Sequence, residues 1–134
     1  MKNRFMIAAI AALFLGQATA SSQEPGKELL GLDLTVVTSN VRYDNEKDGE
    51  NRWDNRKDAL AAEILSANPD IIGTQECLHH QRNYLKKKFK GYNTVGVARE
   101  DGKKDGEYSA IFYRKDRFRA IECGNFWLSE TPDV

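Results

Sequence analysis

The stretch from Leu32 to Glu76 constrains the fold most, because it has the pattern of a strand, a helix and a second strand. Residues 32–38 form a largely apolar run with β-branched side chains, and residues 70–77 contain a second apolar run. The segment 53–68 has apolar positions on one helical face, and Pro69 ends it. A helix of this length can cross over and set the two strands side by side in parallel.

Polar side chains follow both predicted strands. Asn40 and Arg42 come after the first strand, and Gln75 and Glu76 end the second. Taken singly, Glu76 can be a helix cap and Asn40 can form an Asx-turn. Open α/β sheets bind ligands outside the carboxyl ends of their strands, so the four side chains together predict a ligand-binding edge. A hard cation such as Mg²⁺ accepts a carboxylate with water and phosphate oxygens, and an arginine offers phosphate a planar fork.

The remainder of the chain adds one more helix and then strands. A second helix is expected from Leu78 to the lysine-rich segment 86–90, which is either a solvated helix end or a nucleic-acid patch. The turn 114–117 is expected to join the last two strands as a hairpin. Strands are expected at residues 92–99, 108–113 and 118–128, and a charged loop at residues 100–107. This order predicts an α/β (α+β) fold, a mixed sheet with helices on one face and the other face needing a partner layer.

The first twenty residues have the features of a secretory signal peptide. Lys2 and Arg4 precede the apolar run 6–15, and Ala18-Thr-Ala20 is a typical cleavage site. The alternative is an uncleaved membrane anchor, but the run is too short to span a bilayer. We therefore expect cleavage after Ala20, a polar lead over residues 21–31, no transmembrane segment after cleavage, and a secreted or periplasmic location.

Charge and cysteine content limit the possible partners. Removing Lys2 and Arg4 lowers the 20 basic residues to 18 against 20 acidic ones, a net charge of −2. A strongly basic nucleic-acid footprint is therefore excluded. After export Cys77 and Cys123 can pair as a disulfide, or they can be two buried thiols acting as small hydrophobes. The adjacent His79 and His80 lack the spacing of a zinc site, so we assign them to the helix surface or to a substrate rim.

Three motifs in this order resemble the endonuclease/exonuclease/phosphatase superfamily, which includes pancreatic DNase I, neutral sphingomyelinases and inositol-phosphate phosphatases. They are Ser39-Asn-Val-Arg42, Pro69-Asp-Ile-Ile-Gly-Thr-Gln-Glu76 and Gly106-Glu-Tyr-Ser-Ala-Ile-Phe-Tyr113. The loop 44–53 and the ending 126–132 are most similar to exported bacterial members of the superfamily.

The resemblance implies roles for four residues. Glu76 would be the principal ligand of Mg²⁺, or of Mn²⁺ in its place, and Asn40 would help to hold the metal-site water or the phosphate in catalysis. Arg42 would lie near the bound phosphate. Glu107 would match the catalytic glutamate that orients a histidine in DNase I; the alternative is a solvated end of the charged loop.

The same resemblance implies a larger domain. The family fold is a four-layer α-β-β-α sandwich whose second half supplies Gly-Asp-x-Asn and Ser-Asp-His motifs, and neither motif occurs in these 134 residues. Residues 32–134 are thus expected to form the N-terminal portion of such a domain, half of the DNase I-like sandwich without its C-terminal half. Apolar side chains of the late strands, Phe112, Phe126 and Trp127, are then expected to be exposed.

The implied activity is metal-dependent hydrolysis of a phosphate ester, with the 134 residues inactive alone because the histidine base is missing. The substrate would be a nucleic acid, a phospholipid, or a sugar or inositol phosphate; no stable protein partner is evident. Two alternatives stay open. One is a non-catalytic exported binding protein that keeps the ligand edge, and the other is a sphingomyelinase-like lipid phosphodiesterase, for which the charged loops offer no membrane-docking segment.

Overall fold

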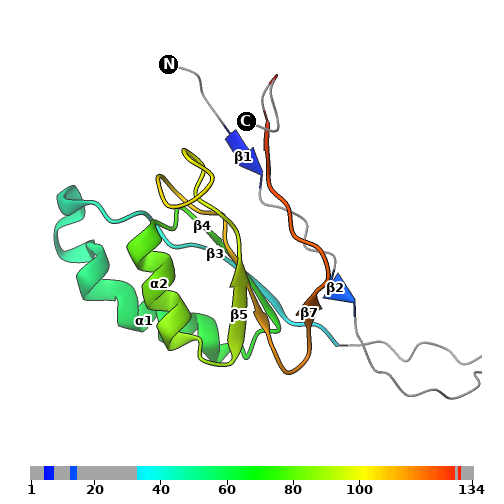
Figure 1. Ribbon diagram of the computed structural model, residues 1–134. Coiled ribbons are helices and arrows are strands. Elements are labelled where there is room, and N and C mark those ends of the chain that lie inside the picture. The colour runs from blue at the N-terminus through cyan, green and yellow to red at the C-terminus, as the bar shows by residue number, and fades with distance from the viewer. Residues whose placement is uncertain (1–4, 8–12, 15–32, 129, 131–134) are drawn as a thin grey trace, which may run out of the picture.

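A computed structural model describes residues 5–7, 13–14, 33–128 and 130 of the chain (Figure 1). Its centre is a four-stranded mixed sheet of order β3-β4-β6-β5. The strands are β3 (Val36–Asn40), β4 (Ile71–Gln75), β5 (Tyr92–Val95) and β6 (Ile111–Arg114). β3 and β4 are parallel, whereas β4 and β5 both pair antiparallel with β6. The predicted mixed α/β architecture is confirmed.

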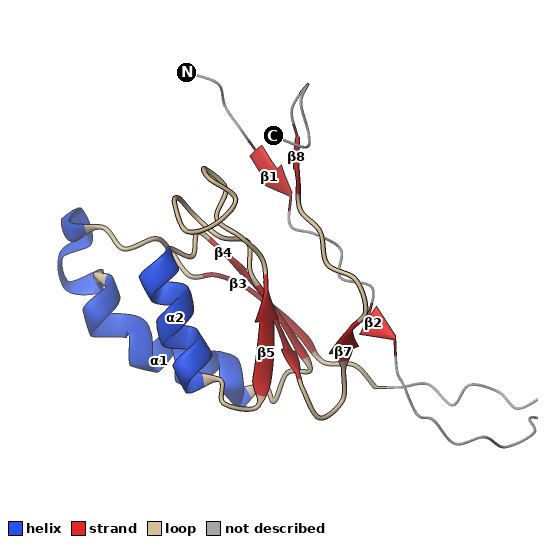
Figure 2. Ribbon diagram, viewed as in Figure 1, coloured by secondary structure: helices blue, strands red, loops and turns tan. Residues whose placement is uncertain are grey.

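The crossover between the two parallel strands is the predicted helix, α1 (Trp53–Ser66). It is preceded by the 3-10 helix η1 (Glu46–Asn51), and β4 is followed by α2 (His79–Lys88). Both α-helices lie on the same side of the sheet (Figure 2). The β3–β4 register pairs Asn40 with Gln75, so the polar strand ends lie at one edge, as the sequence predicts. Among the described residues, no helix is long and apolar enough to cross a membrane.

The core lies between the helices and the sheet. On β4, Ile72 and Thr74 are buried whereas their neighbours are partly exposed, which is the alternation of a strand covered on one face. Phe112 of β6 is fully buried and meets Phe89 edge-to-face at 5.2 Å between ring centroids. Burying each of these rings stabilises the fold by roughly 1.5–3 kcal/mol.

The expected exposure of the late apolar residues is partly wrong. Phe112 is buried because its ring packs against Phe89, which directly follows α2, and not on the uncovered face of the sheet. Phe126 is 39% exposed, as predicted, and the side chain of Trp127 lies outside the described residues. Val36 on β3 is 58% exposed, so the face of the sheet opposite the helices carries apolar surface.

The expected hairpin of the last two strands is also wrong. β6 has both of its edges occupied by β4 and β5, so it has none left for the next strand. Instead β7 (Arg119–Ala120) pairs with β2 (Leu13–Phe14), and β8 (Phe126–Leu128) pairs with β1 (Phe5–Ile7). The predicted signal peptide is not tested by these pairings. The rest of residues 1–20 and the polar lead 21–31 lie outside the described residues.

The two cysteines form neither a disulfide nor a pair of buried thiols. Both thiols are free; Cys77 is buried and Cys123 is exposed. Burial raises the pKa of the Cys77 thiol to about 12, so this side chain acts as a small hydrophobe.

Candidate metal and phosphate site

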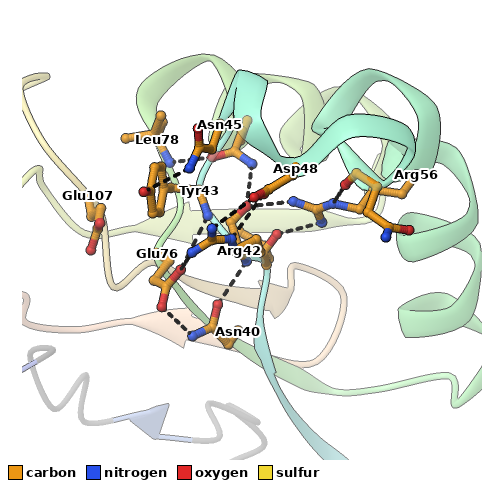
Figure 3. A network of polar contacts seen from close by, with 12 residues as sticks. Asn40, Arg42, Tyr43, Asn45, Asp48, Arg56, Glu76, Leu78 and Glu107 are labelled. Atoms are coloured by element: carbon orange, nitrogen blue, oxygen red, sulfur yellow. Dashed lines mark hydrogen bonds and ion pairs between the residues drawn. The ribbon is translucent and has the colours of Figure 1, made fainter.

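Asn40 and Glu76 meet at the carboxyl ends of the parallel strands β3 and β4 (Figure 3). The Asn40 amide Nδ2 donates to Glu76 Oε1 at 2.9 Å, and the backbone N–H of Tyr43 donates to Oε2 at 3.4 Å. Asn40 Oδ1 accepts from the Arg42 backbone N–H at 2.8 Å, which is the geometry of an Asx-turn. Asn40 can therefore form the Asx-turn with its Oδ1 and contact Glu76 with its Nδ2 at the same time.

Two residues of this edge have a left-handed backbone. Arg42 has φ 53° and Glu76 has φ 55°, a conformation that side chains other than glycine seldom adopt. Each such residue costs on the order of 1–3 kcal/mol and persists where neighbouring contacts hold it. Here the contacts are the Asn40 side chain on one loop and the Cys77–Tyr108 backbone bridge after the other.

The guanidinium of Arg42 is held by Asp48, a residue of η1. Nε and Nη2 donate to the two carboxylate oxygens at 3.0 and 2.9 Å. This hydrogen-bonded pairing raises the pKa of Arg42 and lowers the pKa of Asp48. Nη1 lies 4.0 Å from Glu76 Oε2, and the guanidinium carbon lies 4.5 Å from the centroid of the Tyr43 ring. Arg42 is thus positioned beside Glu76, with its side chain 47% exposed.

Besides Asp48, two further side chains that were not singled out from the sequence shape this edge. Arg56 of α1 donates to the carbonyl oxygens of Val41 and Arg42, each at 2.7 Å. Gln81 of α2 is fully buried and donates to the same Arg42 oxygen at 2.9 Å. In the sequence, Gln81 differs from other polar residues of α2 only in occupying a position on the core-facing side of the helix. Side chains from both helices thus form hydrogen bonds with the loop that carries Arg42.

Glu107 lies on the side of Glu76 away from Asp48 and Arg56 (Figure 3). Its Oε2 accepts from Arg99 Nη1 at 2.9 Å, and its side chain is 23% exposed. The pKa of Arg99 is raised by its hydrogen bond to Glu100 first, and then by the charges of Glu107 and Glu76. The guanidinium of Arg99 thus forms ion pairs with both Glu100 and Glu107.

The two histidines are engaged in separate contacts. His79 Nδ1 lies 2.7 Å from the Tyr108 hydroxyl, and its Nε2 lies 2.9 Å from the Asn83 amide. His80 Nε2 lies 3.0 Å from a carboxylate oxygen of Asp44. His80 is exposed, in agreement with the predicted helix-surface position, and His79 is half-buried.

The donor set at this edge suits a hard cation. Glu76 supplies one carboxylate with its side chain 32% exposed, and Asn40 supplies an amide. Within the described part of the chain, no three His, Cys, Asp or Glu side chains cluster as a closed metal site would require. Mg²⁺ needs no such cage, because it keeps several waters and takes phosphate oxygens. The residues present fit Mg²⁺ and do not fit structural Zn²⁺.

A cavity of about 400 Å³ lies away from these side chains. It is lined by Leu65, Asn68, Gly91, Tyr92, Arg114, Lys115 and Asp116. None of the predicted site residues lines it, so this cavity is separate from the candidate site.

Comparison with known proteins decides the family. The model of the endonuclease/exonuclease/phosphatase family matches residues 37–130, which include all four predicted site residues. The chain belongs to the endonuclease/exonuclease/phosphatase family. No curated protein sequence matches it.

Solved structures of this family resemble the chain closely. A mannosyl-6-phosphatase of Bacteroides thetaiotaomicron is 47% identical with a TM-score of 0.73, over 76% of this chain and 39% of that one. A family protein of Bacteroides vulgatus is 40% identical with a TM-score of 0.70, over 75% and 38%. Another from B. thetaiotaomicron is 48% identical with a TM-score of 0.72, over 75% and 36%. The chain thus spans less than half the length of these family members, in agreement with the predicted partial fold.

Proposed function

We propose that these residues form part of a metal-dependent hydrolase of phosphate esters, with Mg²⁺ bound at Glu76. The observation that carries the proposal is the Asn40–Glu76 hydrogen bond of 2.9 Å at the carboxyl ends of two parallel strands. That edge lies within the residues matched by the family. It combines a carboxylate for the cation with a guanidinium for the phosphate.

Each side chain has a task that follows from its contacts. Glu76 would hold the cation, and Asn40 would keep that carboxylate oriented through its amide. Arg42 would bind a phosphate oxygen beside Glu76, and Glu107 would hold Arg99 near the same edge. When bound, the cation would neutralise charge on the phosphoryl and leaving oxygens.

For the substrate we propose a phosphorylated sugar. The support is the 47% identity to a protein described as a mannosyl-6-phosphatase. A net charge of −2 without residues 1–20 also favours a small phosphate ester over a nucleic acid. The phosphodiesterase and binding-protein alternatives become outcomes of the assay below.

The test begins with the DNA beyond codon 134, which we expect to continue in frame into Gly-Asp-x-Asn and Ser-Asp-His motifs. The complete gene product is then assayed with mannose 6-phosphate, inositol phosphate, sphingomyelin and plasmid DNA, each with Mg²⁺, Mn²⁺ or a chelator. We expect metal-dependent release of phosphate from the sugar. Turnover of only sphingomyelin or DNA would refute the substrate class, and binding without turnover of any ester would refute the enzyme.

The metal site is tested with Glu76→Gln, a change of similar size that removes the charge. Mg²⁺ affinity, measured by calorimetry without substrate, is expected to fall more than about 100-fold, since even outer-shell partners of metal ligands are worth 10–100-fold. Glu63→Gln on the exposed face of α1 is the matched control and should bind Mg²⁺ normally. Unchanged Mg²⁺ affinity in a folded Glu76→Gln variant would remove Glu76 from the site.

A further inference from the structure

Asp48 uses one particular edge of the Arg42 guanidinium. Its two oxygens accept from Nε and Nη2, the side-on edge of the planar group. A guanidinium has a second, end-on edge formed by Nη1 and Nη2, which can pair with another oxyanion in the same plane. In Arg42, Nη1 is the nitrogen closest to Glu76, at 4.0 Å from Oε2. Asp48 therefore leaves the end-on edge directed toward the candidate metal ligand.

The backbone of Arg42 is also held by hydrogen bonds. Its N–H donates to Asn40, and its carbonyl oxygen accepts from both Arg56 and Gln81. The guanidinium also lies over the Tyr43 ring. Because the backbone of Arg42 is held in place, the orientation of its long side chain depends on the two hydrogen bonds to Asp48 and on the contact with the Tyr43 ring.

Asp48 itself is suited to this task. Its side chain is only 17% exposed, whereas that of Arg42 is 47% exposed. It is carried by η1, which begins at an N-cap where the Asn45 side chain accepts from the Lys47 N–H at 3.0 Å. The Asp48 carboxylate is therefore largely shielded from solvent and held by η1, whereas the Arg42 guanidinium stays accessible to a ligand.

We infer that Asp48 is a positioning residue that aims the Nη1–Nη2 edge of Arg42 at a phosphate oxygen held beside Glu76. The inference rests on the proposed function, since it needs a phosphate at this edge. It assigns Asp48 a role that acts through Arg42 and requires no direct contact with the phosphate or the cation.

Two opposite effects can be told apart on removing the Asp48 charge. If Asp48 acted only through its charge, Asp48→Asn would make the edge more positive and would tighten phosphate binding. If Asp48 positions Arg42, the same change frees the side chain and weakens binding. Supporting partners of this kind are typically worth 10–100-fold, so we expect about a tenfold loss. The sign of the change therefore decides between the two roles.

The experiment measures inorganic phosphate binding to the complete gene product with saturating Mg²⁺, together with KM and kcat on the sugar phosphate. The variants are Asp48→Asn, Arg42→Met, which keeps the stem without the guanidinium, and the double variant. Asp54→Asn is the control, because Asp54 is an exposed carboxylate paired with Lys57 on α1. We expect weaker phosphate binding and a raised KM for Asp48→Asn, no change for the control, and no further effect of Asp48→Asn when Arg42 is already Met.

The outcomes separate the inference from the proposed function. If Arg42→Met leaves phosphate affinity unchanged, the phosphate role of Arg42 is wrong and the inference fails with it. If Arg42→Met weakens binding but Asp48→Asn does not, only the positioning role is overturned. An equal loss from Asp48→Asn in the Arg42→Met background would show that Asp48 acts on the general fold, which also overturns the inference. The Arg42 Nε–H signal in NMR spectra gives a direct reading, since its exchange with water should accelerate in folded Asp48→Asn.

Discussion

Replacing Asp70 by asparagine tests whether one buried carboxylate ties the sheet together. Asp70 is 3% exposed, and its Oδ2 accepts from the Thr35 N–H at 2.9 Å. Its other oxygen pairs with Arg117, and its carbonyl accepts from the Arg114 N–H at 3.0 Å. Asp70 thereby connects the segment before β3, the start of β4 and the chain after β6.

The magnitude follows from what asparagine keeps. Its amide oxygen can still accept from Thr35, but its NH₂ group would face the Arg117 guanidinium, donor against donor. Losing a hydrogen bond to a charged group costs roughly 1.5–3 kcal/mol. Arg117 is 31% exposed and can regain water, so we expect a loss of about 2 kcal/mol in the free energy of unfolding. At a denaturant slope of about 2 kcal/mol/M this lowers the urea midpoint by roughly 1 M.

The effect has a defined pH dependence. Burial raises the pKa of Asp70, but the Thr35 N–H and the Arg117 guanidinium outweigh it and leave the pKa lowered. A carboxyl whose folded pKa lies below the unfolded value of about 3.9 stabilises the fold above that pH. This stabilisation is lost as pH falls through the folded pKa. The difference between the wild type and Asp70→Asn should therefore be full at pH 7 and shrink below about pH 4.

The measurement is urea unfolding at several pH values. Asp116→Asn is the control, because it removes the same charge from an exposed pair with Arg114, which is worth about 0–1 kcal/mol. An Asp70→Asn variant as stable as Asp116→Asn at pH 7 would refute the reasoning. So would a difference from the wild type that grows as the pH is lowered.

Three further predictions concern the thiols, the activity and the N-terminus. In the folded protein at pH 8, iodoacetamide should label exposed Cys123 and spare Cys77, whose pKa is raised to about 12; mass spectrometry showing both labelled before unfolding would contradict this. Residues 1–134 alone should hydrolyse no ester above the buffer rate, because they do not contain the Ser-Asp-His motif in which the family resemblance places the base, and base catalysis is worth about 10²–10⁴-fold. Activity lost on changing both His79 and His80 to alanine would disprove that and point to a histidine base. N-terminal sequencing of exported protein should begin at or near Ser21, and an intact Met1 would exclude cleavage.

Local patterns in the sequence determined the strand–helix–strand unit and the edge that carries the candidate site. Side-chain alternation on strands, the 3.6-residue period of helices and the stop at Pro69 are short-range properties, so they can be read without the fold. Because the two strands are parallel, the residues after them had to meet at one edge. Asn40 and Glu76 do so within 2.9 Å although they are 36 positions apart in the chain.

Only the tertiary structure decided which partners those residues have. The pairing of β6 with β4 and β5, and not with β7, depends on which strand edges are free once the chain has packed. Asp48, Arg56 and Gln81 are ordinary polar residues by sequence, and their contacts with Arg42 depend on where η1, α1 and α2 lie. A hydrogen bond requires placement within a few tenths of an ångström. Residue type and spacing define that placement along one element, but packing of the whole domain defines it between elements.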